Sequence, residues 1–128
     1  MKGMTHIYTG DGKGKTTAAL GLALRCAGRG GKALIVQFFK GRDTGELRAL
    51  SQIPAITVLR LERDYGFFHT MDDSSLAEVT ARHNALLRRA IDCARQRDCS
   101  LLVLDEIISA YNCGAVDCGA VDDLLQNK

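Results

Sequence analysis

The sequence has few aromatic residues, little net charge and no long apolar run. Only 5% of its 128 residues are aromatic, it contains one proline, and its formal charge is +2. So small a charge excludes the electrostatic footprint of a nucleic-acid-binding domain. No apolar stretch approaches the about 20 residues of a membrane span, and residues 1–5 show no signal-peptide pattern. We therefore expect a cytoplasmic protein that binds neither nucleic acid nor a membrane.

The five cysteines lack the paired C-x-x-C spacing of zinc and redox motifs. Their odd number gives no complete disulfide framework, so we expect reduced thiols. The remaining composition, with 46% hydrophobic and 25% charged residues, is that of one ordinary soluble domain. A chain of this length can bury a core without disulfides or structural metals.

Short apolar runs alternate with longer helical patterns, which predicts βαβ units around a parallel sheet. The best-marked helix begins near Ser75, which forms a capping box with Glu78. On its apolar face, His83 is expected to be a packing residue. Strands are predicted at Thr5–Thr9, Ala33–Phe39, Ile56–Leu61 and Ser100–Leu104, and further helices at Lys15–Ala27 and around Glu46–Gln52.

A pentapeptide, CGAVD, occurs twice in tandem near the end of the chain, at Cys113–Asp117 and again at Cys118–Asp122. Two copies of five residues do not make a solenoid. The repeat is either a local duplication in a tolerant surface segment or a paired-thiol site.

The strongest chemical signal is a glycine-rich segment between the first strand and the first helix. Three glycines allow backbone N–H groups to turn inward, and the following helix start adds partial positive charge. Its last residues match the G-K-[ST] end of a phosphate-binding loop, whereas threonine stands where the first glycine belongs. The residues expected to bind the nucleotide, ATP or GTP, are Thr9, Gly10, Asp11, Gly12, Lys13, Gly14, Lys15, Thr16 and Thr17.

Within this segment, two lysines are the expected catalytic residues. Lys15 is predicted to lie against the terminal phosphates, and Lys13 supplies a second cation. Thr16 is predicted to offer its hydroxyl to Mg²⁺.

An acidic pair follows the fourth predicted strand, after four apolar residues, Leu101 to Leu104. Asp105 is expected at the carboxyl end of that strand, where parallel α/β sheets bind ligands. A carboxylate there can hold Mg²⁺ directly or through water. Glu106 is expected either to help bind the metal or to orient a water for hydrolysis.

Several segments together resemble the corrinoid adenosyltransferase family. They are TGDGKGKTTAALGLALRCAGRG, LIVQFFKG, DYGFF and VLDEI. In that family the loop reads T-G-[DN]-G-K-G-K-T-T, so Thr9 is the expected residue. The resemblance implies a P-loop NTPase (RecA-like) α/β fold, three-layered, with a mainly parallel sheet.

The resemblance also implies a reaction, namely transfer of the 5′-deoxyadenosyl group of ATP to the cobalt(I) of a reduced corrinoid with release of triphosphate. Such a nucleophile needs no general base, and the chain shows no Ser/His/Asp or Cys/His arrangement. The implied substrates are ATP and the corrinoid, with Mg²⁺. A flavoprotein reductase as electron donor and a homodimer are the implied partners.

The family pattern extends to corrinoid contacts. Phe67 matches an aromatic residue thought to pack on the lower corrin face, and Phe68 and His69 follow it. Some relatives have tryptophan where this chain has His69, whose imidazole either ligates cobalt or points elsewhere. Gln37 and Lys40 match the V-Q-F-x-K-G segment and are second-rank ATP contacts.

Family members continue beyond the acidic strand with a further strand and a T-G-R-like segment, which this sequence does not contain. We therefore expect residues 1–128 to form a single P-loop nucleotide-binding domain that lacks its C-terminal strand or strands. Two alternatives stay open, a P-loop ATPase or small-molecule kinase, and a non-catalytic ATP-binding module.

Overall fold

The computed structural model describes residues 4–8, 14–38, 45–61, 71–96 and 98–126. Strands and helices alternate along them, as the sequence predicts, and end within a few residues of the predicted bounds. The elements are β1 (Met4–Tyr8), α1 (Gly14–Gly28), β2 (Ala33–Gln37), α2 (Gly45–Leu50), β3 (Ile56–Arg60), α3 (Asp73–Arg95), β4 (Leu101–Asp105), α4 (Ile107–Asn112) and α5 (Cys118–Gln126).

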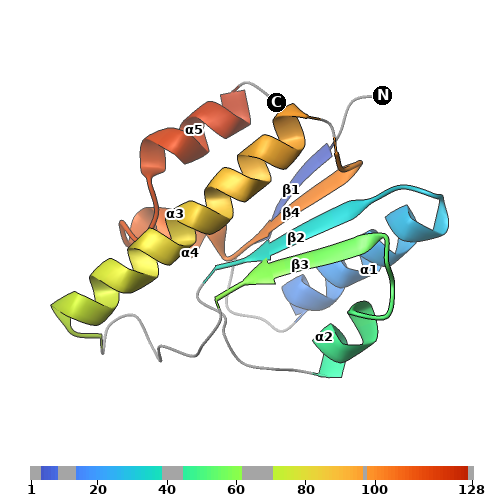
Figure 1. The fold of residues 1–128 in the computed structure, drawn as a ribbon, viewed down its shortest axis with the longest axis horizontal. Coiled ribbons are helices and arrows are strands. Elements are labelled where there is room, and N and C mark those ends of the chain that lie inside the picture. The colour runs from blue at the N-terminus through green and yellow to red at the C-terminus, as the bar shows by residue number, and fades with distance from the viewer. Residues whose placement is uncertain (1–3, 9–13, 39–44, 62–70, 97, 127–128) are drawn as a thin grey trace.

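The four strands form one parallel sheet in the order β1-β4-β2-β3. Helices α3, α4 and α5 cover one face, and α1 and α2 cover the other (Figure 1). The predicted α/β class, the four parallel strands and the three layers are thereby confirmed. The last strand in sequence order, β4, therefore lies in the interior of the sheet, between β1 and β2.

The core divides into two clusters because successive strand residues point to opposite faces. On β2, Leu34 and Val36 belong to the cluster under α3, α4 and α5, while Ala33 and Ile35 belong to the cluster under α1 and α2. All five residues of β2 and of β4 are buried. This explains why their sequences are near-continuous apolar runs rather than alternating ones.

Helix α1 ends in a glycine turn, as the sequence predicts. Gly30 has a φ of +85°, a conformation that costs glycine little, and Gly31 N–H donates to Cys26 O over 3.0 Å. The turn reverses the chain into β2. Because β2 begins only two residues after Gly31, this cap sets where the second strand enters the sheet.

The start of α3 differs from the prediction. Asp72 is the N-cap, and its carboxylate accepts a hydrogen bond of 2.7 Å from Ser75 N–H. Ser75 therefore lies inside the helix and the predicted Ser75–Glu78 capping box is wrong. Aspartate and serine are nearly equivalent as N-caps, so the sequence offered two starts three residues apart.

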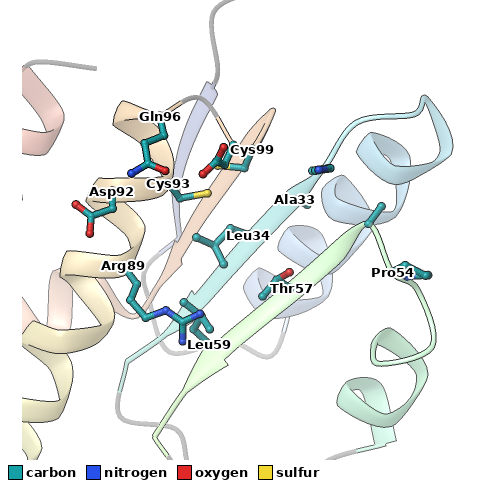
Figure 2. A pocket seen from close by; sticks show the side chains of 13 residues that line it. Ala33, Leu34, Pro54, Thr57, Leu59, Arg89, Asp92, Cys93, Gln96 and Cys99 are labelled. Atoms are coloured by element: carbon teal, nitrogen blue, oxygen red, sulfur yellow. The ribbon is translucent and has the colours of Figure 1, made fainter.

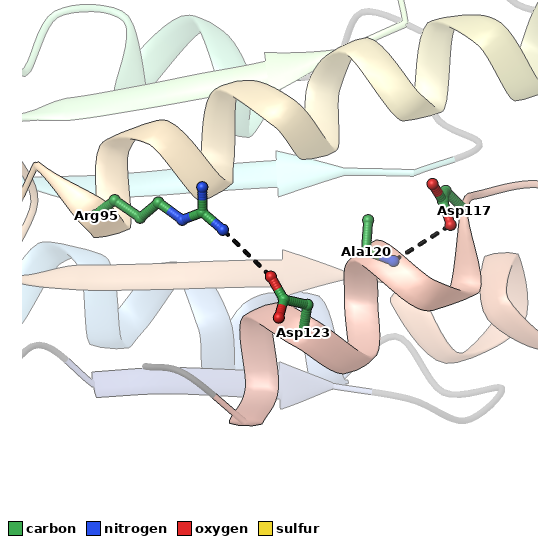
Figure 3. Close-up of polar contacts among 4 residues, drawn as sticks. All are labelled: Arg95, Asp117, Ala120 and Asp123. Carbon is green, nitrogen blue, oxygen red and sulfur yellow. Dashed lines mark hydrogen bonds and ion pairs between the residues drawn. The ribbon is translucent and has the colours of Figure 1, made fainter.

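The two CGAVD copies adopt different structures. In the first, Gly114 has a φ of +70° and the chain turns, whereas the second forms the start of α5. Asp117, the last residue of the first copy, caps α5 by accepting from Ala120 N–H over 3.2 Å. Figure 3 shows this cap and the Arg95–Asp123 ion pair of 3.2 Å that joins α3 to α5. The duplication therefore supplies both a helix cap and the helix that it caps.

All five cysteines are free thiols. The Cys118 thiol donates to Tyr111 O over 3.4 Å and Cys113 is exposed. Across the described parts of the chain, no helix has the length and apolar character needed to cross a membrane.

Candidate active site

The carboxyl ends of all four strands lie in one row at one edge of the sheet. Tyr8 pairs with Asp105, Asp105 with Gln37, and Gln37 with Arg60. Every segment that the sequence marks as functional follows one of these strands or begins at its last residues. The edge therefore gathers residues that are up to about a hundred positions apart in the sequence.

Ligands of open α/β sheets bind at the carboxyl ends of neighbouring strands whose connections run to opposite faces. Strands β1 and β4 meet this condition. The chain passes from β1 to α1 on one face and from β4 to α4 on the other (Figure 1). The pair formed by Tyr8 and Asp105 marks the ends of these two strands.

Asp105 is the last residue of β4, one position beyond the predicted end of that strand, and is only 1% exposed. Its carbonyl oxygen accepts a hydrogen bond of 3.0 Å from Phe38 N–H, which extends the pairing with β2. A buried carboxylate is costly unless opposite charge or hydrogen-bond donors compensate it. Its position between β1 and β2 thus makes it a natural partner for a cation at this edge.

Glu106 has a left-handed backbone conformation with a φ of +67°, the only positive φ of a non-glycine residue in the described segments. Such a conformation costs on the order of 1–3 kcal/mol and is typical of functional sites. Glu106 O accepts from Ala110 N–H over 3.1 Å, so this residue also starts the turn into α4. Its side chain is half-buried next to Asp105. No sequence signal indicated the unusual backbone.

Gln37 ends β2 and is 5% exposed. Because it is in register with Asp105, the structure brings these two candidate residues together at the edge. The next residue, Phe38, is fully buried and was not singled out from the sequence. Its ring packs edge-on against His83, with centroids 5.2 Å apart.

His83 lies on the inner face of α3 and is fully buried. Its Nδ1–H donates to Ala115 O over 2.9 Å, and desolvation by burial lowers its pKa from 6.5 to about 4. The neutral imidazole holds α3 against the turn before α5. The prediction of a packing role for His83 is confirmed.

Helix α1 begins at Gly14, so the backbone of residues 14–17 forms its first turn. First-turn N–H groups have no partner within the helix and carry partial positive charge. The first turn contains no acidic residue. The helix contacts all four strands, which fixes its start relative to the carboxyl edge.

Other predicted residues lie outside the described part of the chain. They are Thr9, Gly10, Asp11, Gly12 and Lys13 of the glycine-rich segment, Lys40 after β2, and Phe67, Phe68 and His69 after β3. Of Gly14, Lys15, Thr16 and Thr17, only the backbone is described. The roles of all of these residues stay predictions.

Two cavities formed by described residues lie away from the carboxyl edge. One of about 470 Å³ lies beside Lys32 and Cys99 at the amino ends of the strands, and one of about 320 Å³ lies between α3 and α5. Among the residues that the structure describes, no three His, Cys, Asp or Glu side chains are grouped as a metal site.

The family described as ATP:corrinoid adenosyltransferase BtuR/CobO/CobP matches residues 1–128. The chain belongs to this adenosyltransferase family. A corrinoid adenosyltransferase of Escherichia coli K12 is 55% identical over 40 residues, which are 31% of this chain and 20% of that protein. The relatives from Pseudomonas aeruginosa and a Sinorhizobium species have the same name, with 30% identity over 117 residues and 29% over 128 residues.

The two longer adenosyltransferase matches cover 91% and 99% of this chain, but 56% and 59% of the relatives. The chain thus spans just under three fifths of the length of these adenosyltransferases. The matched part includes every strand of the sheet and the whole carboxyl edge.

Proposed function

We propose that this chain transfers the 5′-deoxyadenosyl group of ATP to the cobalt(I) of a reduced corrinoid and releases triphosphate. The observation that carries the proposal is the pairing of Tyr8 with Asp105 in a member of the adenosyltransferase family. The glycine-rich segment starts directly after Tyr8 and leads into α1. The glycine-rich segment and the acidic pair, Asp105 and Glu106, therefore start from the ends of neighbouring strands.

The ATP site is proposed to be a P-loop formed by residues 9–17. The start of α1, free of acidic residues in its first turn, favours a bound anion. Lys13 and Lys15 are the catalytic residues of the proposal, because they neutralise the charge that develops on the leaving triphosphate. Thr9, Gly10, Asp11, Gly12, Gly14 and Thr17 complete the loop, and Gln37 and Lys40 approach from β2.

The donor set at the edge fits Mg²⁺. Asp105 and Glu106 are hard carboxylate ligands at the end of β4, and Thr16 adds a hydroxyl from the start of α1. Magnesium typically uses one or two carboxylates together with substrate phosphates and water, so a cluster of three acidic residues is not required. When bound, Mg²⁺ supplies charge neutralisation at the triphosphate.

The proposed reaction is a nucleophilic displacement at the ribose. Cobalt(I) attacks the 5′ carbon, the bond from that carbon to its phosphate oxygen breaks, and the electron pair leaves with the triphosphate. Cobalt is formally oxidised by two electrons. The protein therefore needs to position two substrates and stabilise the leaving group, without a general base.

The corrinoid is proposed to lie where the chain leaves β3. That strand ends at Arg60, in register with Gln37 at the same edge as Asp105. Phe67 is expected to pack on the lower face of the corrin, and Phe68 and His69 are expected nearby. This arrangement would bring cobalt to the carboxyl edge from the β3 side and ATP from the β1 side.

A flavoprotein reductase as electron donor, a homodimer and a cytoplasmic location complete the proposal. Five free thiols support a reducing compartment. Family membership favours adenosyl transfer over the ATPase and kinase alternatives.

The test is to incubate the protein with ATP, Mg²⁺ and a chemically reduced corrinoid. Inorganic triphosphate and the absorbance of a new cobalt–carbon bond are the expected products. Release of orthophosphate alone, independent of corrinoid, contradicts adenosyl transfer and supports an ATPase. ATP-dependent thermal stabilisation without any product supports a binding module instead.

A further inference from the structure

Three of the five cysteines gather at the amino ends of the strands, opposite the candidate active site. Cys26 lies near the end of α1, Cys93 in the last turns of α3, and Cys99 just before β4. All three side chains are half-buried. The Cys93 and Cys99 side chains are close enough to interact electrostatically, and Cys26 also interacts with Cys99 in this way.

The backbone brings Cys93 and Cys99 together. Cys93 O accepts from Asp98 N–H over 3.0 Å, which closes the turn after α3. On the other side of Cys99, Ser100 N–H donates to Lys32 O over 2.8 Å, where β4 enters the sheet beside β2. Cys99 is thus held between two fixed backbone segments, close to the end of α3 that carries Cys93.

Both thiols also line the cavity of about 470 Å³ between α3 and the starts of β2 and β3. Figure 2 shows Cys93 and Cys99 side by side on its wall, with Arg89 further along α3. Arg89 and Lys32 at this cavity are exposed cations. The cavity gives a small solute a route to the two half-buried cysteines.

We propose that Cys93 and Cys99 are a redox-active thiol pair that hydrogen peroxide or another small hydroperoxide converts to an intrachain disulfide. Cys93 sulfur attacks the peroxide, the O–O bond breaks, and the departing oxygen takes the thiol proton and leaves as water. Cys99 sulfur then attacks the resulting sulfenic acid, the S–O bond breaks, and the Cys99 proton leaves with a second water. Two thiols are oxidised and one peroxide is reduced to two waters.

The order of these steps follows from the surroundings of Cys99. Burial, Cys93 and the Asp98 charge raise the Cys99 pKa, which disfavours the Cys99 thiolate. The thiolate is the reactive nucleophile toward peroxides. Cys93 is therefore the first to react and Cys99 resolves the sulfenic acid.

The test treats the intact, folded protein with hydrogen peroxide and maps the cross-link without reduction. Trypsin separates Ala90–Arg95 from the peptide that starts at Asp98, and a second cleavage after Glu106 removes Cys113 and Cys118 from that peptide. We expect the number of titratable thiols to fall by two, from five to three. The linked peptides should contain Cys93 and Cys99.

Three single variants make the outcome specific. Cys99→Ser should abolish the cross-link and leave a sulfenic acid on Cys93, and Cys93→Ala should abolish both products. Cys113→Ser, which changes an exposed thiol away from the cavity, should leave the cross-link intact. Circular dichroism and thermal midpoints establish that each variant folds. A cross-link that includes Cys26, oxidation of Cys113 alone, or five thiols that all survive peroxide overturns the proposal.

Discussion

Phe38 N–H donates a hydrogen bond of 3.0 Å to Asp105 O, one residue beyond the end of β2. This bond continues the sheet to its carboxyl edge and fixes the position of the acidic residue from the β2 side. On the β1 side, Tyr8 is in register with the same residue. The backbone of Asp105 is therefore held by both neighbouring strands, which is the rigidity that the proposed metal-binding role requires.

Asp105→Asn tests the proposed metal role. The substitution keeps the shape of the side chain but removes its charge, so triphosphate release should fall about 100-fold at a given Mg²⁺ concentration. The thermal midpoint without ATP, measured for both proteins, establishes that the variant folds. Full turnover at limiting Mg²⁺ would show that Asp105 does not serve the metal.

Lys15→Ala tests the phosphate-binding loop. ATP at about 100 times its Kd stabilises a protein by about 2.7 kcal/mol, and this gain should disappear with the variant. Lys32→Ala is the matched control, since Lys32 is an exposed lysine at the opposite ends of the strands. Thermal shifts with and without ATP provide the measurement, and an unchanged shift in Lys15→Ala rejects the loop assignment.

Protonation of His83 should destabilise the fold in acid. Burial lowers its pKa from 6.5 to about 4, so the unfolded chain binds a proton that the folded protein does not. Its contribution is fully present above pH 6.5 and is lost as the pH falls toward 4, by about 3 kcal/mol. Denaturant unfolding at pH 7 and pH 5 should show about 2 kcal/mol of this loss, because the titration is not complete at pH 5. His83→Gln keeps a donor for Ala115 O and should have a shallower pH dependence; an identical slope would assign the loss to other groups.

Phe67→Ala separates corrinoid binding from ATP binding. If Phe67 packs on the corrin, the variant should retain the ATP-dependent thermal shift. The corrinoid bound to the variant should be harder to reduce than the corrinoid bound to the unaltered protein. Spectroscopic titration with a reductant measures the second effect. An equal loss of ATP binding and corrinoid reduction identifies Phe67 as a structural residue.

The start of α3 distinguishes the observed cap from the predicted one. Asp72→Ala should lower the thermal midpoint, since it removes the acceptor for Ser75 N–H. Ser75→Ala leaves that acceptor and should lower the midpoint less. The hydrogen bonds from Ser75 lower the pKa of Asp72, so the difference between the variants should shrink once Asp72 is protonated in acid. A larger fall in the midpoint for Ser75→Ala than for Asp72→Ala would instead support the predicted Ser75–Glu78 capping box.

Local patterns in the sequence predicted the elements but not their arrangement. Apolar runs identify β2 and β4 because both strands are covered on both faces. The central place of β4 depends on contacts with β1, almost a hundred residues earlier, and no local pattern encodes it. The CGAVD repeat is the clearest case, since identical residues form a turn at Cys113 and a helix at Cys118. Tertiary surroundings decide between them.

In the candidate site, too, local patterns predicted some features and tertiary contacts determined others. Residue types and spacing identified Asp105 and Glu106, and the resemblance to the adenosyltransferase family identified Gln37. Parallel strands bring these residues to one edge. The positive φ of Glu106 and the packing of Phe38 on His83 arise only when α3 and α4 are in place. They were therefore not predictable from short segments.

Each strand of this sheet is only five residues long. At about 3.3 Å per residue, the two ends of β4 are roughly 13 Å apart, which is beyond the about 7–10 Å over which substitutions usually couple. Changes at Cys99 and changes at Asp105 should thus have additive effects on the free energy of unfolding. Substitutions at the thiol end can therefore be combined with substitutions at the carboxyl edge, and their separate effects on the free energy of unfolding can be summed.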